Sequence, residues 1–291
     1  MTMRIEVSLA AKKRLVERGL RSLLSKDDTV LHQAMRYAVF SGGKRFRPIL
    51  LLSSGDCFGA SQDMLLPFAC GLELIHNYSL IHDDLPSMDD DDFRRGKSSC
   101  HRAFGENIAL LAGDALLTLA FETMAKASVP PELLPQKQEA IKAISRRAGA
   151  SGMIGGQVLD VTLNPRKLTR RLVDELVLKK TGALIIAAVE AGALLGQAKP
   201  SQRRSILDYG KNIGLAFQVR DDLIDFDGRQ KTKKPLRPDY AVFFGPDKAR
   251  KQLEELVRRA IASLREFGRK AGELSYLASS LLILKPEAKH G

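Results

Sequence analysis

The sequence contains no tryptophan and few aromatic residues of any kind. Phenylalanine and tyrosine together make up 6% of its 291 residues. Proteins that bind single-stranded nucleic acid stack the bases on aromatic side chains, so this composition disfavours that class of function. No recognised nucleic-acid-binding motif is present either. We therefore predict no nucleic-acid partner.

Cysteines and long apolar runs are also scarce. The three cysteines are odd in number and show no CxxC spacing, which disfavours a disulfide framework or a zinc site. The N-terminus lacks the apolar core of a secretory signal. The longest apolar stretches, 108–121 and 182–196, are interrupted by Asp114 and Glu190 and are too short to span a bilayer. These absences predict a soluble cytoplasmic protein without stable membrane insertion.

Basic residues are in clear excess. Lysine and arginine outnumber aspartate and glutamate by 46 to 34, which gives a formal net charge of +12. Such a surplus favours an anionic partner, such as phosphorylated small molecules, nucleic acid or an acidic membrane surface. A solvated basic surface is the other interpretation. Because 44% of the residues are hydrophobic, a chain of this length can bury a large core.

The spacing of apolar residues is helical along most of the chain. Apolar residues recur at i, i+3, i+4 and i+7, and few segments alternate with period two, so strands are expected to be few or absent. The predicted helices lie within residues 31–39, 64–82, 109–127, 139–154, 169–195, 203–226 and 247–267. Glycine and proline fall between them, but no break is long enough for a linker. The pattern predicts a single all-α domain, residues 1–291.

Two clusters of aspartate stand out, DDLPSMDDDD at 83–92 and DDLID at 221–225. Clustered carboxylates repel one another and persist mainly where cations neutralise them. Oxygen ligands suit Mg²⁺, which takes the rest of its shell from water and substrate phosphates. Asp221 and Asp225 lie one turn apart on a helix face and can share a cation. The clusters predict two carboxylate walls that hold Mg²⁺ and a polyphosphorylated substrate.

The first cluster is less regular than the second. Asp83 and Asp89 are six residues apart, so a regular helix would point them to different faces. Pro86 is expected to break or bulge the helix and let Asp89 return toward Asp83. Ideal helical spacing would instead favour Asp90. Spacing alone leaves the partner of Asp83 open.

A glycine-rich segment carries basic residues that could bind an anion. Gly42 and Gly43 allow close approach of the backbone, and Lys44 and Arg47 follow them. Pro48 suits the first turn of a helix, whose N-terminus attracts anions. A plain surface loop is the alternative interpretation of this segment.

Further basic residues lie beside the first aspartate cluster. Arg94 and Arg95 follow it directly, where they either balance its charge or bind diphosphate oxygens. His76 lies nearly two helical turns before Asp83 on the same face, which favours a hydrogen-bond donor to an anion. His82 is better explained by packing between helices.

Together these features resemble the trans-isoprenyl diphosphate synthases (polyprenyl synthetases), and most closely the bacterial farnesyl diphosphate synthases. The matching stretches are GGKRFRP (42–48), ELIHNYSLIHDDLPSMDDDDFRRGKSSCH (73–101), LAGDALL (111–117), GGQVLD (155–160), KKTGAL (179–184) and FQVRDDLID (217–225). They span roughly residues 40 to 230 in the family's order. Agreement across so many motifs is highly specific.

The resemblance implies a bundle of antiparallel helices around a deep central cavity, normally as a homodimer. It implies a prenyltransferase that condenses isopentenyl diphosphate with dimethylallyl or geranyl diphosphate and releases pyrophosphate. It also implies Mg²⁺ as cofactor, with three ions per active site when substrate is bound.

The resemblance assigns roles to individual residues. Those implied to bind Mg²⁺ are Asp83, Asp89 and Asp221, supported by Asp84, Asp222 and Asp225. Those implied to bind isopentenyl diphosphate are Lys44, Arg47, His76 and Arg95, and Arg94 is implied to bind the allylic diphosphate. Those implied to flank the allylic cation and its diphosphate are Lys180, Thr181 and Gln218.

Tyr78 is the implied determinant of product length. It lies five residues before Asp83, which is about 7.5 Å along a helix, where a growing prenyl chain would pass. In the family, a bulky aromatic residue here and the longer DDxxxxD form of the first motif accompany a C15 product. We expect farnesyl diphosphate, with geranylgeranyl diphosphate as the alternative. A core tyrosine without such a role is the other interpretation.

The sequence departs from the family pattern after Asp225. The loop there is shorter, and Arg237 stands where the family has a substrate-binding lysine. Arginine keeps the charge but is not a compact point charge. The short loop leaves a non-catalytic partner subunit of a related synthase as one alternative. A terpene cyclase is another, although cyclases take one diphosphate substrate and this chain retains a second basic site.

Overall fold

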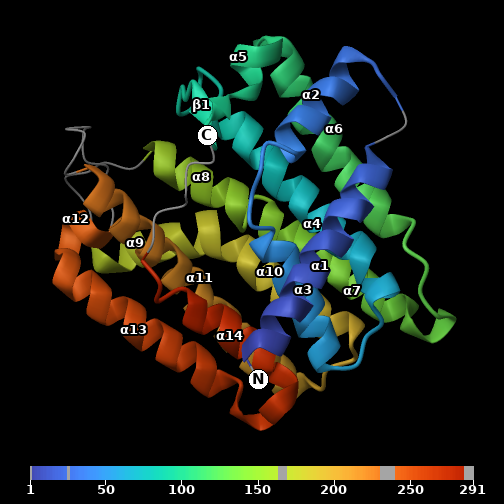
Figure 1. Cartoon of the computed structure of the whole chain (residues 1–291), viewed down its shortest axis with the longest axis vertical. Helices are drawn as coiled ribbons and strands as arrows, with labels where there is room; N and C mark the ends of the chain where they lie inside the picture. The colour runs from blue at the N-terminus through green and yellow to red at the C-terminus, as the bar shows by residue number, and fades with distance from the viewer. Residues whose placement is uncertain (1, 25–26, 163–168, 230–239, 285–291) are drawn as a thin grey trace.

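The protein is built almost entirely from α-helices (Figure 1), which confirms the all-α prediction. The computed structural model describes residues 2–24, 27–162, 169–229 and 240–284. The helices of the first half are α1 (Thr2–Leu23), α2 (Val30–Val39), α3 (Phe46–Cys57), α4 (Gln62–Asp83), α5 (Cys100–Phe104), α6 (Glu106–Ala125) and α7 (Leu134–Ala148). Those of the second half are α8 (Met153–Thr162), α9 (Arg170–Val177), α10 (Ala183–Leu195), α11 (Pro200–Arg229), α12 (Tyr240–Phe244), α13 (Pro246–Ser263) and α14 (Gly272–Ser280).

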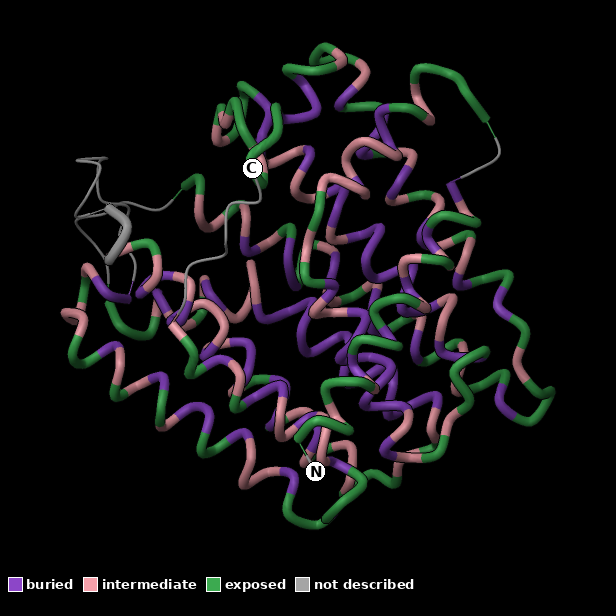
Figure 2. The backbone as a smooth tube through the Cα atoms, viewed as in Figure 1, coloured by how far each residue is buried: buried purple, intermediate pink, exposed green. Residues whose placement is uncertain are grey.

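Helix α10 lies at the centre of the bundle. All 13 of its residues are buried, and it packs against α3, α4, α7 and α11. A helix that is apolar on every face is stable only when other helices surround it. Gly192 lets α3 approach closely, because a Cβ atom there would lie 2.4 Å from the carbonyl oxygen of Leu51. Figure 2 shows that the buried residues gather around this centre and that the outer helices expose one side.

The charged residue of α10 is Glu190, which is 5% exposed. Its carboxylate accepts a hydrogen bond from Nε of Arg147 at 2.7 Å and lies 3.7 Å from Nη2 of Arg146. Both arginines belong to α7. The ion pairs satisfy a carboxylate that would otherwise be costly to bury, and they join α7 to the central helix.

One predicted helix is wrong in its extent. The segment 139–154 is two helices, α7 and α8, with a turn at Gly149 and Gly152 between them. A Cβ atom on Gly152 would lie 1.9 Å from the carbonyl oxygen of Arg147, so the turn requires glycine. The described strands, β1 (Phe93–Arg94) and β2 (Lys97–Ser98), form one short antiparallel hairpin, as the expectation of few strands allowed.

Helices α4 and α6 are long and apolar enough to cross a membrane by length and composition. The apolar window of α4 is 72% buried inside the protein, which marks α4 as a core helix. The window of α6 is only 33% buried. Leu110 and Leu111 of α6 are 47% and 52% exposed, so part of its apolar face is uncovered in the single chain.

Candidate active site

The chain turns back on itself after α4. The helix ends at Asp83, and Pro86 follows two residues after its cap, Asp84. The backbone N–H of Asp89 donates to the carbonyl oxygen of Asp83 at 2.9 Å. The expected helix break at Pro86 is confirmed, and the backbone of Asp89 lies beside that of Asp83.

The two adjacent aspartates at the end of α4 have different surroundings. Asp83 is partly exposed and lines a large apolar cavity. Asp84 is 2% exposed, and its Oδ1 accepts a hydrogen bond from Nε of Arg94 at 2.9 Å. Because Nη2 of Arg94 also contacts Asp84, fewer of its donors are left for a diphosphate. Asp84 therefore holds the β1–β2 hairpin, and Asp83 remains available to a ligand.

The hairpin carries Arg95 to the glycine-rich loop. Arg95 and Gly96 occupy its turn with φ of 54° and 79°, as a two-residue turn between antiparallel strands requires. The guanidinium of Arg95 donates to the carbonyl oxygen of Gly42. Gly43, beside this guanidinium, has a φ of 123°, a backbone conformation that favours glycine.

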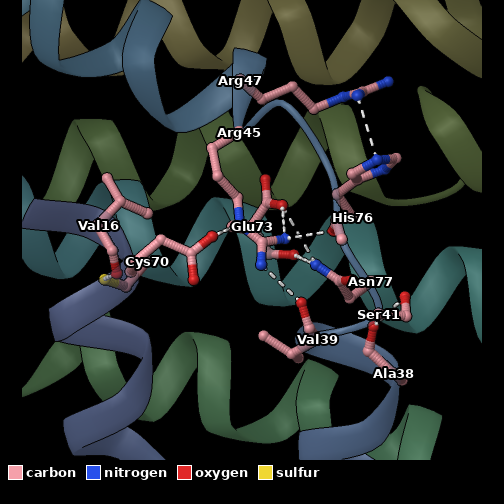
Figure 3. Close-up of polar contacts among 12 residues, drawn as sticks. Val16, Ala38, Val39, Ser41, Arg45, Arg47, Cys70, Glu73, His76 and Asn77 are labelled. Atoms are coloured by element: carbon pink, nitrogen blue, oxygen red, sulfur yellow. Dashed lines mark hydrogen bonds and ion pairs between the residues drawn. The ribbon is translucent and has the colours of Figure 1, made fainter. Parts of the chain in front are cut away.

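The side chain of Arg45 points toward Glu73, whereas that of Arg47 points toward His76 (Figure 3). Arg45 is 2% exposed, and its guanidinium contacts Glu73 at 2.8 Å, Glu17 at 2.7 Å and the carbonyl oxygen of Val39 at 2.7 Å. These contacts anchor the loop between α2 and α3. The guanidinium of Arg45 is therefore occupied by protein groups, although Arg45 belongs to the lining of the basic cavity together with Lys44 and Arg47.

A basic cavity of about 500 Å³ lies between this loop, α4 and α11. The residues predicted to bind isopentenyl diphosphate all line it: Lys44, Arg47, His76 and Arg95. Nη1 of Arg47 lies 3.3 Å from Nε2 of His76. Burial, together with the neighbouring arginines, lowers the pKa of His76 well below its usual value. His76 is therefore neutral near pH 7, and the positive charge of the cavity comes from lysine and arginine.

The second aspartate cluster lies on α11. As in the first cluster, one aspartate lines a cavity and the next one is buried. Asp221 lines the basic cavity, whereas Asp222 is 6% exposed. Asp222 accepts hydrogen bonds from Nε2 of Gln218 at 2.7 Å and from the backbone N–H of Tyr240 at 3.0 Å. Asp222 thus holds the start of α12. Asp225, one turn further along α11, is exposed.

A π-helical turn, η3 (Leu178–Gly182), carries Lys180 and Thr181. Such turns widen a helix locally and are frequent at functional sites. Oγ1 of Thr181 donates to Oε1 of Gln218 at 2.7 Å, and Nζ of Lys180 donates to Asp160 at 2.5 Å. Of the predicted trio, Thr181 and Gln218 therefore meet, whereas Lys180 is held by a carboxylate that the sequence did not reveal.

An apolar cavity of about 670 Å³ adjoins the basic one, and the two share Arg47 and His76. Its polar end includes Asp83, Lys180 and Thr181. The apolar lining comes from α4, α6 and α8 and includes Tyr78, Leu110, Leu117, Met153, Val158 and Val161. Together, the two adjoining cavities correspond to the central cavity that the family resemblance implied.

Tyr78 is 5% exposed, and its ring packs edge-on against His82 with centroids 5.6 Å apart. Nε2 of His82 lies 3.0 Å from the carbonyl oxygen of Leu110 on α6. His82 therefore packs between helices, as expected. Tyr78 lines the apolar cavity, which is compatible with its predicted role in product length.

Burial outweighs the nearby positive charges at the carboxylates that face the cavities. Burial raises the pKa of Asp83 to about 6, with Lys180 opposing the shift and Asp89 adding to it. Burial likewise raises the pKa of Asp221 to about 6, against the effect of Arg220. Within the described residues, no three His, Cys, Asp or Glu side chains converge closely enough to hold a metal by themselves. The oxygen ligands that Asp83 and Asp221 offer are of the type that suits Mg²⁺, which takes the rest of its shell from water and substrate phosphates.

Three residues near the cavities were not predicted. Gln157 lines the apolar cavity, and both polar atoms of its amide are buried without a hydrogen-bond partner. Asp160 holds Lys180, and the buried Arg220 contacts Asp221 at 3.1 Å. The first two lie in the matching GGQVLD stretch, which could have indicated them. Arg237 and the short loop before it lie outside the described residues.

Comparisons with known proteins agree with this geometry. The family model for polyprenyl synthetase matches residues 28–241. The chain is 39% identical over 286 residues to a geranylgeranyl diphosphate synthase of Cyanophora paradoxa, covering 94% of each protein. It is 40% identical over 259 residues to the farnesyl diphosphate synthase of Escherichia coli, covering 86% of this chain and 87% of that one.

The structural match is equally extensive. The crystal structure of an FPP/GFPP synthase from Zymomonas mobilis superposes with a TM-score of 0.88 at 35% identity, covering 97% of this chain and all of that one. The fold is that of the isoprenoid synthases, and the enzyme class is prenyltransferase. The chain belongs to the polyprenyl synthetase family.

Proposed function

We propose that the protein condenses isopentenyl diphosphate with dimethylallyl or geranyl diphosphate to give farnesyl diphosphate and pyrophosphate. The observation that carries this proposal is the adjoining pair of cavities, one basic and one apolar. The basic cavity suits the diphosphate of the first substrate, and the apolar cavity suits the prenyl chain of the second.

Mg²⁺ fits the aspartates that line the cavities or lie beside them. Asp83 and Asp221 would be its principal ligands, with Asp89 and Asp225 adding oxygens beside them. The two buried aspartates would keep their protein partners and hold these ligands in place. When bound, Mg²⁺ neutralises charge on the allylic diphosphate and so assists its departure. Three ions per site are part of this proposal.

The bond changes follow from the two substrates. The allylic C–O bond breaks, and its electron pair stays on the departing diphosphate. The alkene of isopentenyl diphosphate then supplies the electrons of the new C–C bond. The adjacent carbon loses a proton to the departing pyrophosphate, which restores a double bond. No side-chain base is needed in this scheme.

The chain's own residues position and protect these groups. Lys44, Arg47, His76 and Arg95 would hold isopentenyl diphosphate at a fixed distance from the allylic carbon. The hydroxyl of Thr181 and the amide of Gln218 would lie beside the cation. The apolar lining excludes water, which would otherwise capture the cation.

Arg94 and Lys180 would need to exchange partners to reach the allylic diphosphate. Arg94 would give up its contact with Asp91 at 3.4 Å, and Lys180 would give up Asp160. A diphosphate carries more charge than either carboxylate, which favours the exchange.

We further propose a cytoplasmic homodimer without stable membrane insertion. The uncovered apolar face of α6, including Leu110 and Leu111, supports a second copy as its occupant. Light scattering after gel filtration should report twice the chain mass of 32.0 kDa. A monomer at micromolar concentration would contradict this part of the proposal.

The direct test of the function is product analysis. Purified protein is incubated with Mg²⁺, labelled isopentenyl diphosphate, and dimethylallyl, geranyl or farnesyl diphosphate in turn. We expect elongation of the first two to a C15 product. A C20 product would favour a geranylgeranyl diphosphate synthase. No elongation with any partner would favour a non-catalytic subunit, and cyclised product from a single substrate would favour a terpene cyclase.

A further inference from the structure

The end of the described chain forms one wall of the basic cavity. Ser280 at the end of α14, and Leu281 and Ile283 after it, line the cavity together with the glycine-rich loop. The matched family segment ends at residue 241, so this wall lies outside it. The shape of the proposed diphosphate site therefore depends on how α14 is held.

The start of α14 is held by a buried charge cluster. Lys12 of α1 is 1% exposed, and its Nζ contacts Asp56 of α3 at 2.7 Å and also contacts Glu273 of α14. Oγ of Ser53 donates to Glu273 at 2.6 Å, and Oγ of Ser8 donates to it at 2.6 Å. Three helices therefore meet at one carboxylate.

Such a cluster is better explained by a role in orienting the helices than by a contribution to the stability of the fold. The attraction within a buried ion pair offsets only part of the cost of removing both charges from water. Proteins with apolar residues in place of the pair are often as stable. An apolar contact can slide, whereas a lysine held by several oxygens fixes distance and direction. Glu273 precedes Ser280 by seven residues, about two helical turns, so it controls the direction in which the end of α14 points.

The end of the wall is held by α11. The guanidinium of Arg220 is largely buried and bridges two groups: Nη1 contacts Oδ1 of Asp221 at 3.1 Å, and Nε donates to the carbonyl oxygen of Ile283 at 3.4 Å. The hydroxyl of Tyr209, also on α11, donates to the carbonyl oxygen of Leu274 at 2.8 Å. Arg220 thus links the second aspartate cluster to the cavity wall.

We propose that Arg220 and Glu273 are positioning residues for isopentenyl diphosphate, because they fix the C-terminal wall of its binding cavity. The inference rests on the proposed function. Neither residue needs to touch the reacting atoms. Their loss should weaken the diphosphate site and leave the apolar cavity of the allylic substrate unchanged.

The variants are chosen to keep charge or shape. Arg220→Lys retains the positive charge beside Asp221, but a single ammonium lacks the fork that bridges to Ile283. Glu273→Gln retains the size of the side chain and removes its charge. Arg147→Lys is the matched control, because Arg147 is also an ion-paired arginine but lines neither cavity.

Binding of isopentenyl diphosphate is measured by calorimetry in metal-free buffer, so that changes at the Mg²⁺ ligands do not contribute. Loss of a charge-assisted contact should weaken binding about tenfold in Arg220→Lys and Glu273→Gln. The control should bind like the wild type. In the elongation assay, Glu273→Gln, which lies away from the Mg²⁺ ligands, should raise KM for isopentenyl diphosphate about tenfold and keep KM for geranyl diphosphate and kcat within about twofold.

The outcomes separate the inference from the function on which it rests. Folded variants that bind isopentenyl diphosphate as the wild type does would overturn the inference. Equal changes in both KM values would also overturn it, because they would indicate a general loss of structure. A wild type that neither binds nor elongates isopentenyl diphosphate would refute the proposed function instead. If Glu273→Gln does not fold, Arg220→Lys alone decides.

Discussion

Replacing Tyr78 by alanine should lengthen the product. Tyr78 lies about 7.5 Å along α4 from Asp83, at about 1.5 Å per residue, and its ring lines the apolar cavity. Without the ring, the next residue on the same face that can stop the chain is Leu74, about one helical turn deeper, or about 6 Å.

This additional depth matches one elongation step. An isoprene unit adds four carbon–carbon bonds of about 1.5 Å each, or roughly 5 Å in an extended chain. The main product of Tyr78→Ala should therefore change from C15 to C20. The lost packing should lower the free energy of unfolding by at most about 3 kcal/mol, because the site already borders a cavity.

Tyr78→Phe is the matched control. The hydroxyl of Tyr78 is buried without a hydrogen-bond partner, and its removal leaves the ring in place. This variant should keep the wild-type product and stability. Products are sized chromatographically from labelled isopentenyl diphosphate with dimethylallyl diphosphate. An unchanged product in Tyr78→Ala, or a longer one in Tyr78→Phe, would refute the assignment of the ring as the cavity floor.

Two further predictions concern buried charge. Glu190→Ala leaves Arg147 without its buried partner, and it should lower the free energy of unfolding by about 3 kcal/mol in urea titrations; a change under about 1 kcal/mol would contradict this. In metal-free protein, Asp83 and Asp221 have pKa values raised from 3.8 to about 6. Between these pH values the folded state therefore binds more protons than the unfolded state does. Stability should fall as pH rises through this window. The double variant Asp83→Asn/Asp221→Asn should lose this part of the pH dependence, and an unchanged profile would show that other groups cause it.

The sequence predicted the helices and motifs well where one periodicity extends over many residues. The π-helical turn at Lys180 interrupts that periodicity by only one residue, so it left no separate signal. The break between α7 and α8 was missed because apolar residues continue across Gly149 and Gly152, although the backbone cannot continue as a helix there.

The directions of individual side chains were harder to predict. Lys44, Arg45 and Arg47 have the same charge, but Arg45 turns inward because Glu17 and Glu73 from other helices provide its partners. Nothing local in the sequence distinguishes them.

The two members of each aspartate pair also look alike in the sequence. Only tertiary contacts show that Asp84 and Asp222 hold neighbouring segments and that Asp83 and Asp221 face the cavities. The wall formed after α14 was not predicted, because it lies beyond every matching motif.

The central claim is that the two aspartate walls act together through Mg²⁺ in prenyl transfer. The most direct measurement is the initial rate of labelled isopentenyl diphosphate incorporation by Asp83→Ala and Asp221→Ala, with thermal unfolding as the check on folding. Loss of transition-state charge stabilisation of about 4 kcal/mol predicts a fall of roughly a thousandfold in each folded variant. Near-normal turnover in either would contradict the claim.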